Sequence, residues 1–143
     1  MAFSAAPYLR RVYYYETDKM GIVHHSNYIR WMEEARIDYM RQAELSYEDV
    51  EKLGILMPVV DVSCRFRVSA RFGDEVAVLA RMTEFNGVRA RFTYELRLSG
   101  PEGRLLAEGE SGHCFVDAKT MQPLSMKRRD PAFYGKALSL LGD

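Results

Sequence analysis

The sequence predicts an α+β protein in which one long helix packs against about five antiparallel strands. Over residues 27–43 apolar side chains recur at spacings of three and four, which is the period of a helix. From residue 59 onward the apolar period changes to two, which is the period of a strand. The links between these strands are short, and short links join antiparallel neighbours, because a parallel crossover needs about a dozen residues.

Before the long helix, residues 8–17 are expected to form a first strand, since the aromatic run 13–15 suits a strand. After it, residues 46–53 are expected to form a short second helix. Ser46 would cap this helix, with Asp49 at the third helical position. Gly54 would end it.

Four further strands are predicted at 59–68, 75–85, 88–98 and 104–116. The alternation is cleanest in 88–98, where apolar and polar residues exchange at every position. Asn86-Gly87 is a strong signal for a two-residue hairpin turn. The tail from Ala118 has a weak helical pattern over 131–141.

The chain has 143 residues, of which 48% are hydrophobic and 28% charged, so we expect one soluble domain spanning 1–143. A formal net charge of +0 gives no reason to expect nucleic acid or a membrane surface as a partner. No apolar run approaches the roughly 20 residues of a membrane helix, and the first seven residues are too short and uncharged for a signal peptide. Cys64 and Cys114 lack metal-ligand spacing, which favours reduced thiols and a cytoplasmic location.

The stretch from Tyr13 to Arg36 holds the candidate chemistry. It predicts the end of a strand, a tight loop with Asp18, and the start of the long helix, capped by Ser26 or Asn27. Gly21 permits a backbone conformation that other residues resist. The loop would bring a carboxylate close to unpaired amides of the helix N-terminus, a pairing that suits acyl chemistry.

Within this stretch, the run TDKMGIVHHSNY (17–28) followed by WMEEAR (31–36) resembles the signature of the hotdog-fold acyl-CoA thioesterases. The resemblance is to the 4-hydroxybenzoyl-CoA thioesterase type, which includes small thioesterases associated with the Tol-Pal envelope system. It implies a hotdog fold, with a curled five-stranded sheet around a long central helix. Lys19-Met20 departs from the small residue usual in the family, so the loop beside the acid is expected to differ in shape.

The resemblance also implies a function. The chain would hydrolyse an acyl-CoA or acyl-carrier-protein thioester to a free acid and the thiol, without a metal or other cofactor. Active sites in the family are shared between subunits, so a homo-oligomer is expected, at least a dimer and, by the resemblance, a homotetramer. Uncovered edge strands in so small a sheet also favour an oligomer.

By this resemblance Asp18 is the catalytic carboxylate, which acts as a nucleophile or as a general base on water. The backbone N–H of His25 is the donor to the oxyanion. Gly21 would let the backbone approach the substrate. Asp18 has an alternative role as a loop acid that accepts hydrogen bonds from nearby backbone N–H groups. The His25 side chain could assist proton transfer or pack locally, and His24 has a weaker case, with its ring expected to point away from that of His25.

Four other motif positions have structural interpretations. Asn27 is explained by capping and Tyr28 by core packing. Glu33 and Arg36 are expected to form an ion pair on the helix surface or at a subunit interface. His113, on the last strand, is expected to be a hydrogen-bonded sheet residue.

Coenzyme A carries phosphates, so arginines are candidates for the substrate-binding surface. Arg89 and Arg91 lie on the polar face of the strand 88–98, and Arg128 and Arg129 lie in the tail. The alternative for all four is a solvated charged surface.

Two rival functions remain open. One is a hotdog dehydratase or hydratase, which presents its His and acid on a different arrangement of loop and helix. The other is a non-catalytic protein that binds acyl-CoA or an acyl-carrier protein. The sequence does not specify the acyl group.

Overall fold

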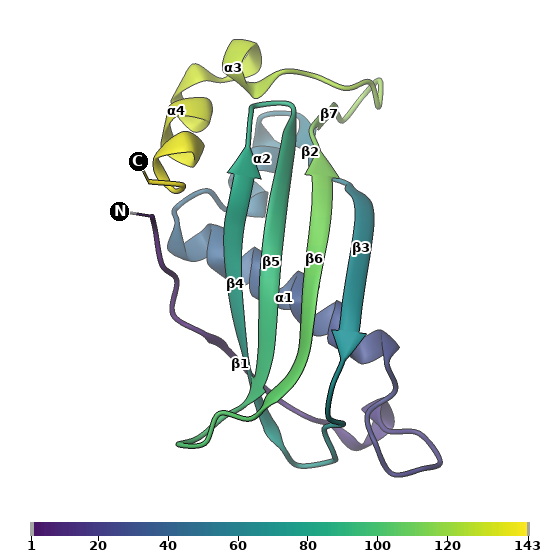
Figure 1. The fold of residues 1–143 in the computed structure, drawn as a ribbon. Helices are drawn as coiled ribbons and strands as arrows, with labels where there is room; N and C mark the ends of the chain where they lie inside the picture. The colour runs from purple at the N-terminus through teal and green to yellow at the C-terminus, as the bar shows by residue number, and fades with distance from the viewer. Residues whose placement is uncertain (1, 143) are drawn as a thin grey trace.

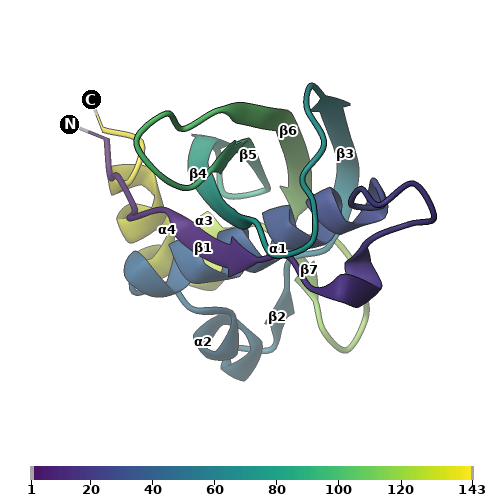
Figure 2. The same cartoon turned by 90° about the horizontal axis from the view of Figure 1, so that it is seen from below.

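The computed structural model describes residues 2–142, which form a five-stranded antiparallel sheet with one long helix against one face (Figures 1 and 2). The sheet has the order β1-β4-β5-β6-β3, and a separate two-stranded sheet pairs β2 with β7. The strands are β1 (Tyr8–Arg11), β2 (Ile55–Leu56), β3 (Val59–Phe66), β4 (Glu75–Phe85), β5 (Arg89–Leu98), β6 (Leu105–Cys114) and β7 (Val116–Asp117). The helices are α1 (Ser26–Gln42), α2 (Tyr47–Lys52), α3 (Met126–Arg129) and α4 (Pro131–Ser139), with a 3-10 turn η1 (Tyr14–Glu16).

The core lies between α1 and the sheet. Trp31, Met32 and Tyr39 project from α1, and all are at most 1% exposed. They meet the inner side chains of the central strands, among them Phe92 on β5 and Leu106 on β6, both fully buried. The predicted α+β class and the antiparallel sheet are therefore confirmed. The strong curl of the sheet around the helix, which the resemblance implied, is not confirmed.

Several local predictions are confirmed. Ser46 caps α2 and accepts a hydrogen bond from the backbone N–H of Asp49 at 3.2 Å, and Gly54 follows with a φ of +75°. Strand β4 has the predicted bounds. Both cysteines are free. The weak helical pattern of the tail corresponds to α4, whose first turn is capped by Asp130.

The hairpin between β4 and β5 forms one residue later than its sequence signal suggested. The N–H of Asn86 donates to the carbonyl of Arg89 at 3.1 Å, so the two loop residues are Gly87 and Val88. Gly87 has a φ of +90°, and glycine at the first loop position is the pattern of a type II′ turn. The Asn86 side chain accepts from the N–H groups of Val88 and Arg89, which explains why asparagine precedes the glycine.

The first strand is shorter than predicted. It ends at Arg11, and the aromatic run 13–15 enters the 3-10 turn, where Tyr14 and Tyr15 are 75% and 78% exposed. The chain turns here because the carboxylate of Glu16 accepts a hydrogen bond from the N–H of Tyr13 at 2.8 Å. Aromatic residues indicated a strand, but this local hydrogen bond determines the structure.

Strand β3 is an exposed edge of the sheet. It pairs with β6 on one side, and within residues 2–142 no strand pairs with its other side. Val62 and Phe66 remain 43% and 48% exposed, although the Phe66 ring contacts Tyr28 of α1 at a centroid distance of 5.3 Å. The alternating apolar residues of this strand thus leave an apolar strip uncovered.

Arg36 lies on the inner side of α1, so the expected surface ion pair with Glu33 is wrong. Its side chain is 4% exposed, and its Nε donates to the hydroxyl of Tyr47 on α2 at 2.7 Å. Within the described chain it makes no ion pair with a carboxylate. Helical position 36 follows Met32 by one turn, and this places it on the buried face with Met32.

Behind Arg36 runs a short chain of buried hydrogen bonds. The Tyr94 hydroxyl lies 2.6 Å from Ser111 Oγ, which lies 2.7 Å from Nε2 of His113. His113 is therefore hydrogen-bonded within the sheet, as predicted, but it is 1% exposed. Burial, with the nearby Arg36 cation, lowers the pKa of His113 from 6.5 to about 4.

Stability should therefore depend on pH through His113. Because its folded pKa is lowered, the unfolded chain binds a proton at this imidazole between about pH 6.5 and 4 while the folded chain does not. The free energy of unfolding should fall by roughly 3 kcal/mol from pH 7 to pH 4 through this group. Urea titrations of wild type and His113→Gln at both pH values test this. The variant should be less stable at pH 7 but lose less on acidification, and an unchanged pH dependence would contradict the assignment.

Candidate active site

Asp18 lies at the start of a small hairpin loop between η1 and α1. Thr17 pairs with Val23, and the Asp18 N–H donates to the carbonyl of Ile22 at 2.8 Å. Gly21, with a φ of +80°, turns the chain back, and its N–H donates to the Asp18 carbonyl at 3.0 Å. The loop is thus closed by its own backbone bonds.

The Asp18 carboxylate is half-buried and has one oxygen engaged. Its Oδ1 accepts from the backbone N–H of Met20 at 2.8 Å, which is the hydrogen bond expected of a loop acid. Among residues 2–142, its Oδ2 has no hydrogen-bond partner, and the carboxylate forms no ion pair. The side chain is therefore oriented through one oxygen and free to react through the other.

The long helix starts one residue earlier than predicted, and neither expected cap is correct. Ser26 is the first helical residue, and its N–H reaches the ring Nδ1 of His24 at 3.3 Å. The Asn27 side chain points away from the helix amides and donates to backbone carbonyls of residues 16 and 24. The sequence signal was ambiguous because His24 takes the place of a usual capping residue.

This start leaves one amide of the helix N-terminus without a partner. The N–H groups of Asn27 and Tyr28 donate to the carbonyls of His24 and His25, at 3.0 and 3.2 Å. The N–H of His25 itself has no acceptor among the residues that the structure describes. An N–H at the positive end of a helix dipole is a favourable donor to a negatively charged oxygen.

The two histidine rings do not point apart, contrary to expectation. They stack at a centroid distance of 4.2 Å, and the His25 ring also meets the edge of Phe66, at the end of β3, at 6.1 Å. His24 Nδ1 is 2.9 Å from the hydroxyl of Ser26. His25 therefore packs locally, between His24 and the exposed edge strand.

An open hollow borders the loop. Its lining includes Asp18, Lys19, His24, Asn27 and Arg30. Gly21 and His25 are not part of this lining. Asp18 thus lines an open hollow at the surface.

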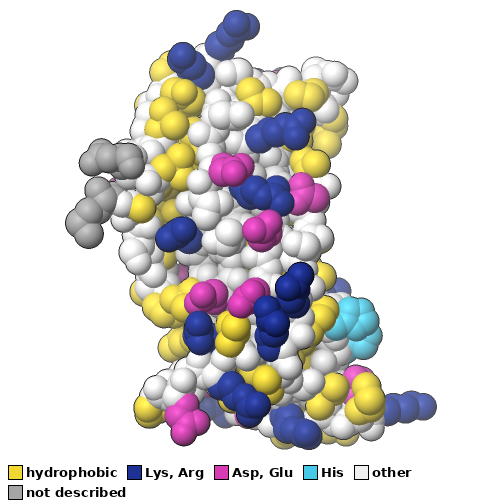
Figure 3. Space-filling model, viewed as in Figure 1, with side chains coloured by type: hydrophobic (Ala, Val, Ile, Leu, Met, Phe, Trp, Pro, Cys, Tyr) yellow, Lys and Arg dark blue, Asp and Glu magenta, His cyan; other side chains and the backbone are white. Residues whose placement is uncertain are grey.

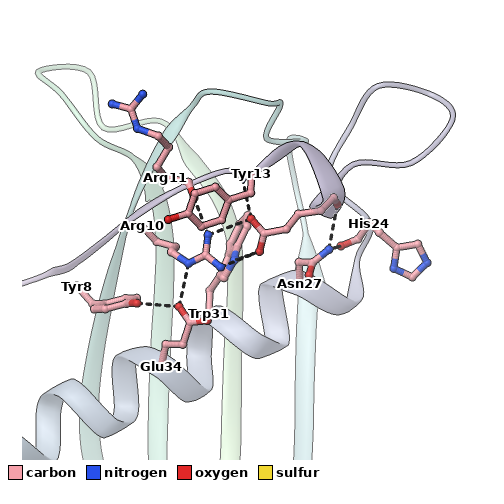
Figure 4. Close-up of polar contacts among 9 residues, drawn as sticks. Tyr8, Arg10, Arg11, Tyr13, His24, Asn27, Trp31 and Glu34 are labelled. Carbon is pink, nitrogen blue, oxygen red and sulfur yellow. Dashed lines mark hydrogen bonds and ion pairs between the residues drawn. The ribbon is translucent and has the colours of Figure 1, made fainter.

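Sequence reasoning missed the residue that holds this loop in place, which is Glu16. Glu16 is 2% exposed, and its two carboxylate oxygens lie 3.0 and 2.9 Å from the guanidinium of Arg10. The indole Nε1 of Trp31 donates to it at 3.0 Å. Figure 4 shows these contacts with the neighbouring Tyr8 and Glu34. Prediction of a strand through residue 17 hid this role, although a lone acid among aromatic residues was a usable signal.

The arginines expected at the substrate phosphates lie at the other end of the sheet. Arg89 and Arg91 begin β5 next to the hairpin, and Arg128 and Arg129 belong to α3, whereas the loop that contains Asp18 lies at the opposite end (Figure 1). A single chain therefore does not bring these arginines and Asp18 together.

Two of the four arginines are engaged in ion pairs. Arg91 pairs with Asp61 at 3.1 Å and Glu110 at 3.3 Å, on an outer sheet face where acidic and basic side chains intermingle (Figure 3). Arg129 pairs with Asp117 at 3.0 Å. Arg89 and Arg128 are exposed and form no ion pair within residues 2–142. These two are the arginines available for a phosphorylated ligand.

Two features are absent from residues 2–142. No helix in this part of the chain is long and apolar enough to cross a membrane. No group of three or more His, Cys, Asp and Glu side chains there is arranged to hold a metal ion.

The comparisons with known proteins support a hotdog-fold thioester hydrolase. The chain belongs to the thioesterase-like superfamily, whose family profile matches residues 12–133. It is 32% identical over 123 residues to the putative acyl-CoA thioesterase YneP of Bacillus subtilis, covering 86% of this chain and 88% of that protein.

Solved structures agree with this assignment. The chain is 29% identical to a DHNA-CoA thioesterase from Staphylococcus aureus, with a TM-score of 0.89 over 94% of this chain and 89% of that one. It is 34% identical to the hypothetical protein TT1821 from Thermus thermophilus, with a TM-score of 0.85 over 95% and 99% of the two chains.

The loop geometry predicts that Gly21→Ala destabilises the protein by about 1 kcal/mol or more. A Cβ at this position would meet nothing within 4 Å, so the cost comes from the φ of +80° alone. Gly135→Ala in α4 is the matched control, because its Cβ also meets open space and its φ is not positive. That change should stabilise the helix by up to about 1 kcal/mol. Equal effects of the two substitutions in chemical denaturation would contradict the backbone argument.

Proposed function

We propose that the protein is an acyl-CoA thioesterase that hydrolyses its substrate to a free acid and coenzyme A. The observation that carries the proposal is the position of two groups at the two ends of one short loop. One is the Asp18 carboxylate, with one oxygen unengaged, and the other is the His25 amide, and neither that oxygen nor that amide has a hydrogen-bond partner within residues 2–142. Membership of the thioesterase-like superfamily supports it. So do the names of similar proteins, an acyl-CoA thioesterase and a DHNA-CoA thioesterase.

In the proposed mechanism the thioester carbonyl oxygen accepts a hydrogen bond from the His25 N–H. Negative charge develops on this oxygen as the tetrahedral intermediate forms, and the helix dipole strengthens the bond. The thiolate of coenzyme A is a good leaving group, so no strong general acid is required.

Two roles for Asp18 fit this scheme. As a nucleophile, its oxygen bonds to the carbonyl carbon, the thiolate leaves, and water then hydrolyses the resulting anhydride. As a general base, it takes a proton from the water that attacks the same carbon. In both cases its Oδ1 stays oriented by Met20, and the free Oδ2 reacts. Gly21 supports either role by keeping the loop tight beside the substrate.

We further propose that the working unit is a homodimer, or a homotetramer built from it, with β3 paired to β3 of a second copy. The exposed edge and the apolar strip of Val62 and Phe66 support this arrangement. A two-fold antiparallel pairing would place the Phe66 end of one strand beside the Val59 end of the other.

This pairing would also complete the substrate site. His25 contacts Phe66 at one end of β3, while Asp61 near the other end is bonded to Arg91. The loop with Asp18 would then lie beside the end of the second copy that carries Arg89 and Arg91. We propose Arg89 and Arg128 as the residues that bind the phosphates of coenzyme A, because neither forms an ion pair within residues 2–142.

The finer classification remains a prediction of the motif, namely the 4-hydroxybenzoyl-CoA type with its Tol-Pal-associated branch. A cytoplasmic location is proposed because Cys64 and Cys114 are free thiols. The acyl-carrier protein stays open as the thiol carrier in place of coenzyme A. The alternatives are a hotdog dehydratase or hydratase and a non-catalytic acyl-CoA-binding protein.

Release of free thiol from a panel of short, medium, branched and aromatic acyl-CoAs tests the function and the role of Asp18. Asp18→Asn keeps the side-chain shape and removes the charge. It should lower kcat on the best substrate by about 10²–10⁴-fold while folding and substrate binding persist. Asp49→Asn, an exposed acid at the start of α2, is the control and should keep the wild-type rate.

The outcomes separate the alternatives. Hydration of an enoyl-CoA without thiol release would identify a hydratase, and binding without turnover would identify a non-catalytic protein. A folded Asp18→Asn variant with near wild-type kcat would refute the mechanism but leave the thioesterase assignment intact.

Val62→Asp should convert the oligomer to a monomer, because it introduces a charge into the apolar strip of β3. Sedimentation at micromolar concentration measures the oligomeric state, and thiol release measures activity in the same sample. Leu138→Asp on α4, at a site with a comparable exposure of 36%, should leave both unchanged. A wild-type protein that is monomeric and fully active would contradict the shared site.

A further inference from the structure

We propose that Glu16, Arg10 and Asn27 are positioning residues that fix the separation between the Asp18 carboxylate and the His25 amide. The inference rests on the proposed thioesterase function, since it gives these residues a role in that reaction. All three border the hollow beside Asp18, but the role proposed here does not depend on contact with the substrate. Each acts through the junction between the loop and the start of α1.

The first part of this device is the Glu16 side chain. Its carboxylate accepts two hydrogen bonds from Arg10, one from the N–H of Tyr13 and one from the indole of Trp31. Four donors fill the acceptor sites of a carboxylate. Because these donors come from β1, from the residue before η1 and from α1, the side chain joins three segments that are separate in the sequence.

The second part is the backbone carbonyl of the same residue. It accepts from the N–H of His24 at 2.8 Å and from the side-chain Nδ2 of Asn27 at 2.9 Å. Glu16 is two residues before Asp18, and His24 is one residue before His25. The Glu16 carbonyl therefore joins the backbone next to Asp18 to the backbone next to His25. The Asn27 side chain, in the first turn of α1, adds a second hydrogen bond to the same oxygen.

The third part is the immobilisation of Arg10. Burial disfavours the charge of Arg10, but hydrogen bonds to Glu16 and Glu34 outweigh that effect and raise its pKa. Its Nε lies 3.0 Å from Glu34, and its guanidinium lies 4.7 Å from the centre of the Tyr13 ring. Arg10 thus stays charged and in one orientation, and it transmits the position of β1 to Glu16 (Figure 4).

A positioning role differs from a general structural role in what it affects. Trp31 links the junction to the core between α1 and the sheet, but Asn27 bonds only to backbone carbonyls at its edge, and the loop closes on its own backbone bonds. Loss of a contact at the junction should therefore alter the separation of Asp18 and His25 more than it alters the fold. Displacement of a catalytic group by about 1 Å can cost around 10²-fold in rate.

The test uses two variants of different severity. Glu16→Gln removes the buried charge, and it carries a risk of misfolding because it leaves Arg10 without one of its partners. Asn27→Ala removes only the side-chain bond to the Glu16 carbonyl at the edge of the junction. Glu48→Gln is the control, since it breaks an ion pair with Arg41 in which both side chains are more than half exposed.

Kinetics with the best acyl-CoA provide the first readout. Asn27→Ala should lower kcat about tenfold, and folded Glu16→Gln should lower it more, with KM changed less than threefold in both. In an Asp18→Asn background neither substitution should lower the residual rate further, because residues that act as one unit are not additive. Additive effects, or an unchanged kcat in folded Asn27→Ala, would overturn the proposal.

Hydrogen–deuterium exchange provides a second readout that does not depend on activity. Backbone amides of residues 17–27 should exchange faster in Asn27→Ala than in wild type, whereas the exchange rates in β4 and β5 of this variant should not change. In the Glu48→Gln control, exchange in residues 17–27 should match wild type. Unchanged exchange in 17–27 would overturn the positioning role. If wild type releases no thiol, the proposed function fails on that measurement, which is distinct from a failure of the junction alone.

Discussion

The buried ion pair between Glu16 and Arg10 is the interaction on which the N-terminal third of the structure depends. Removing two charges from water is costly, and the attraction between them compensates only when the remaining hydrogen-bonding sites are also filled. Here the Glu16 carboxylate has four donors, and Arg10 bonds to a second carboxylate, that of Glu34. The short first strand, the 3-10 turn and the entry into α1 all follow from this satisfied pair.

The second constraint is that the sheet holds the Asp18 loop and the four arginines at opposite ends. The loop with Asp18 lies at one end of the sheet and the arginines at the other (Figure 1), so the two parts of the proposed substrate site cannot meet within a single chain. The exposed strand β3 runs between those two ends. A two-fold pairing along this strand would reunite them, which is why we connect the missing part of the site with oligomerisation.

The sequence predicted those features that depend on periodic patterns or on local turn chemistry. Strand β4, the cap at Ser46 and the turn at Gly54 follow from the side chains of a few neighbouring residues. Asp18 and the amide at His25 were found because a loop and a helix start are local features, and a family motif marks them. Their catalytic roles remain proposals.

Features that depend on distant partners were missed. Glu16 was included in a strand because its donors, Arg10 and Trp31, come from separate elements. Arg36 was expected on the surface because charge usually indicates exposure, yet hydroxyl groups on α2 and β5 receive its hydrogen bonds. The exposure of Val62 and Phe66 on β3 was not predictable, because alternation shows which residues share a face but not what covers that face.

The central claim is that the free amide of His25 receives the carbonyl oxygen of the substrate. The most direct test is the backbone ¹H–¹⁵N signal of His25 during titration with an acyl-CoA analogue in which a methylene group replaces the thioester sulfur. The ketone of this analogue cannot be hydrolysed but still presents the oxygen. We predict that the His25 amide proton shifts downfield at saturation, in wild type and in Asp18→Asn alike. Saturation with an unmoved His25 signal, while other amides shift, would contradict the claim.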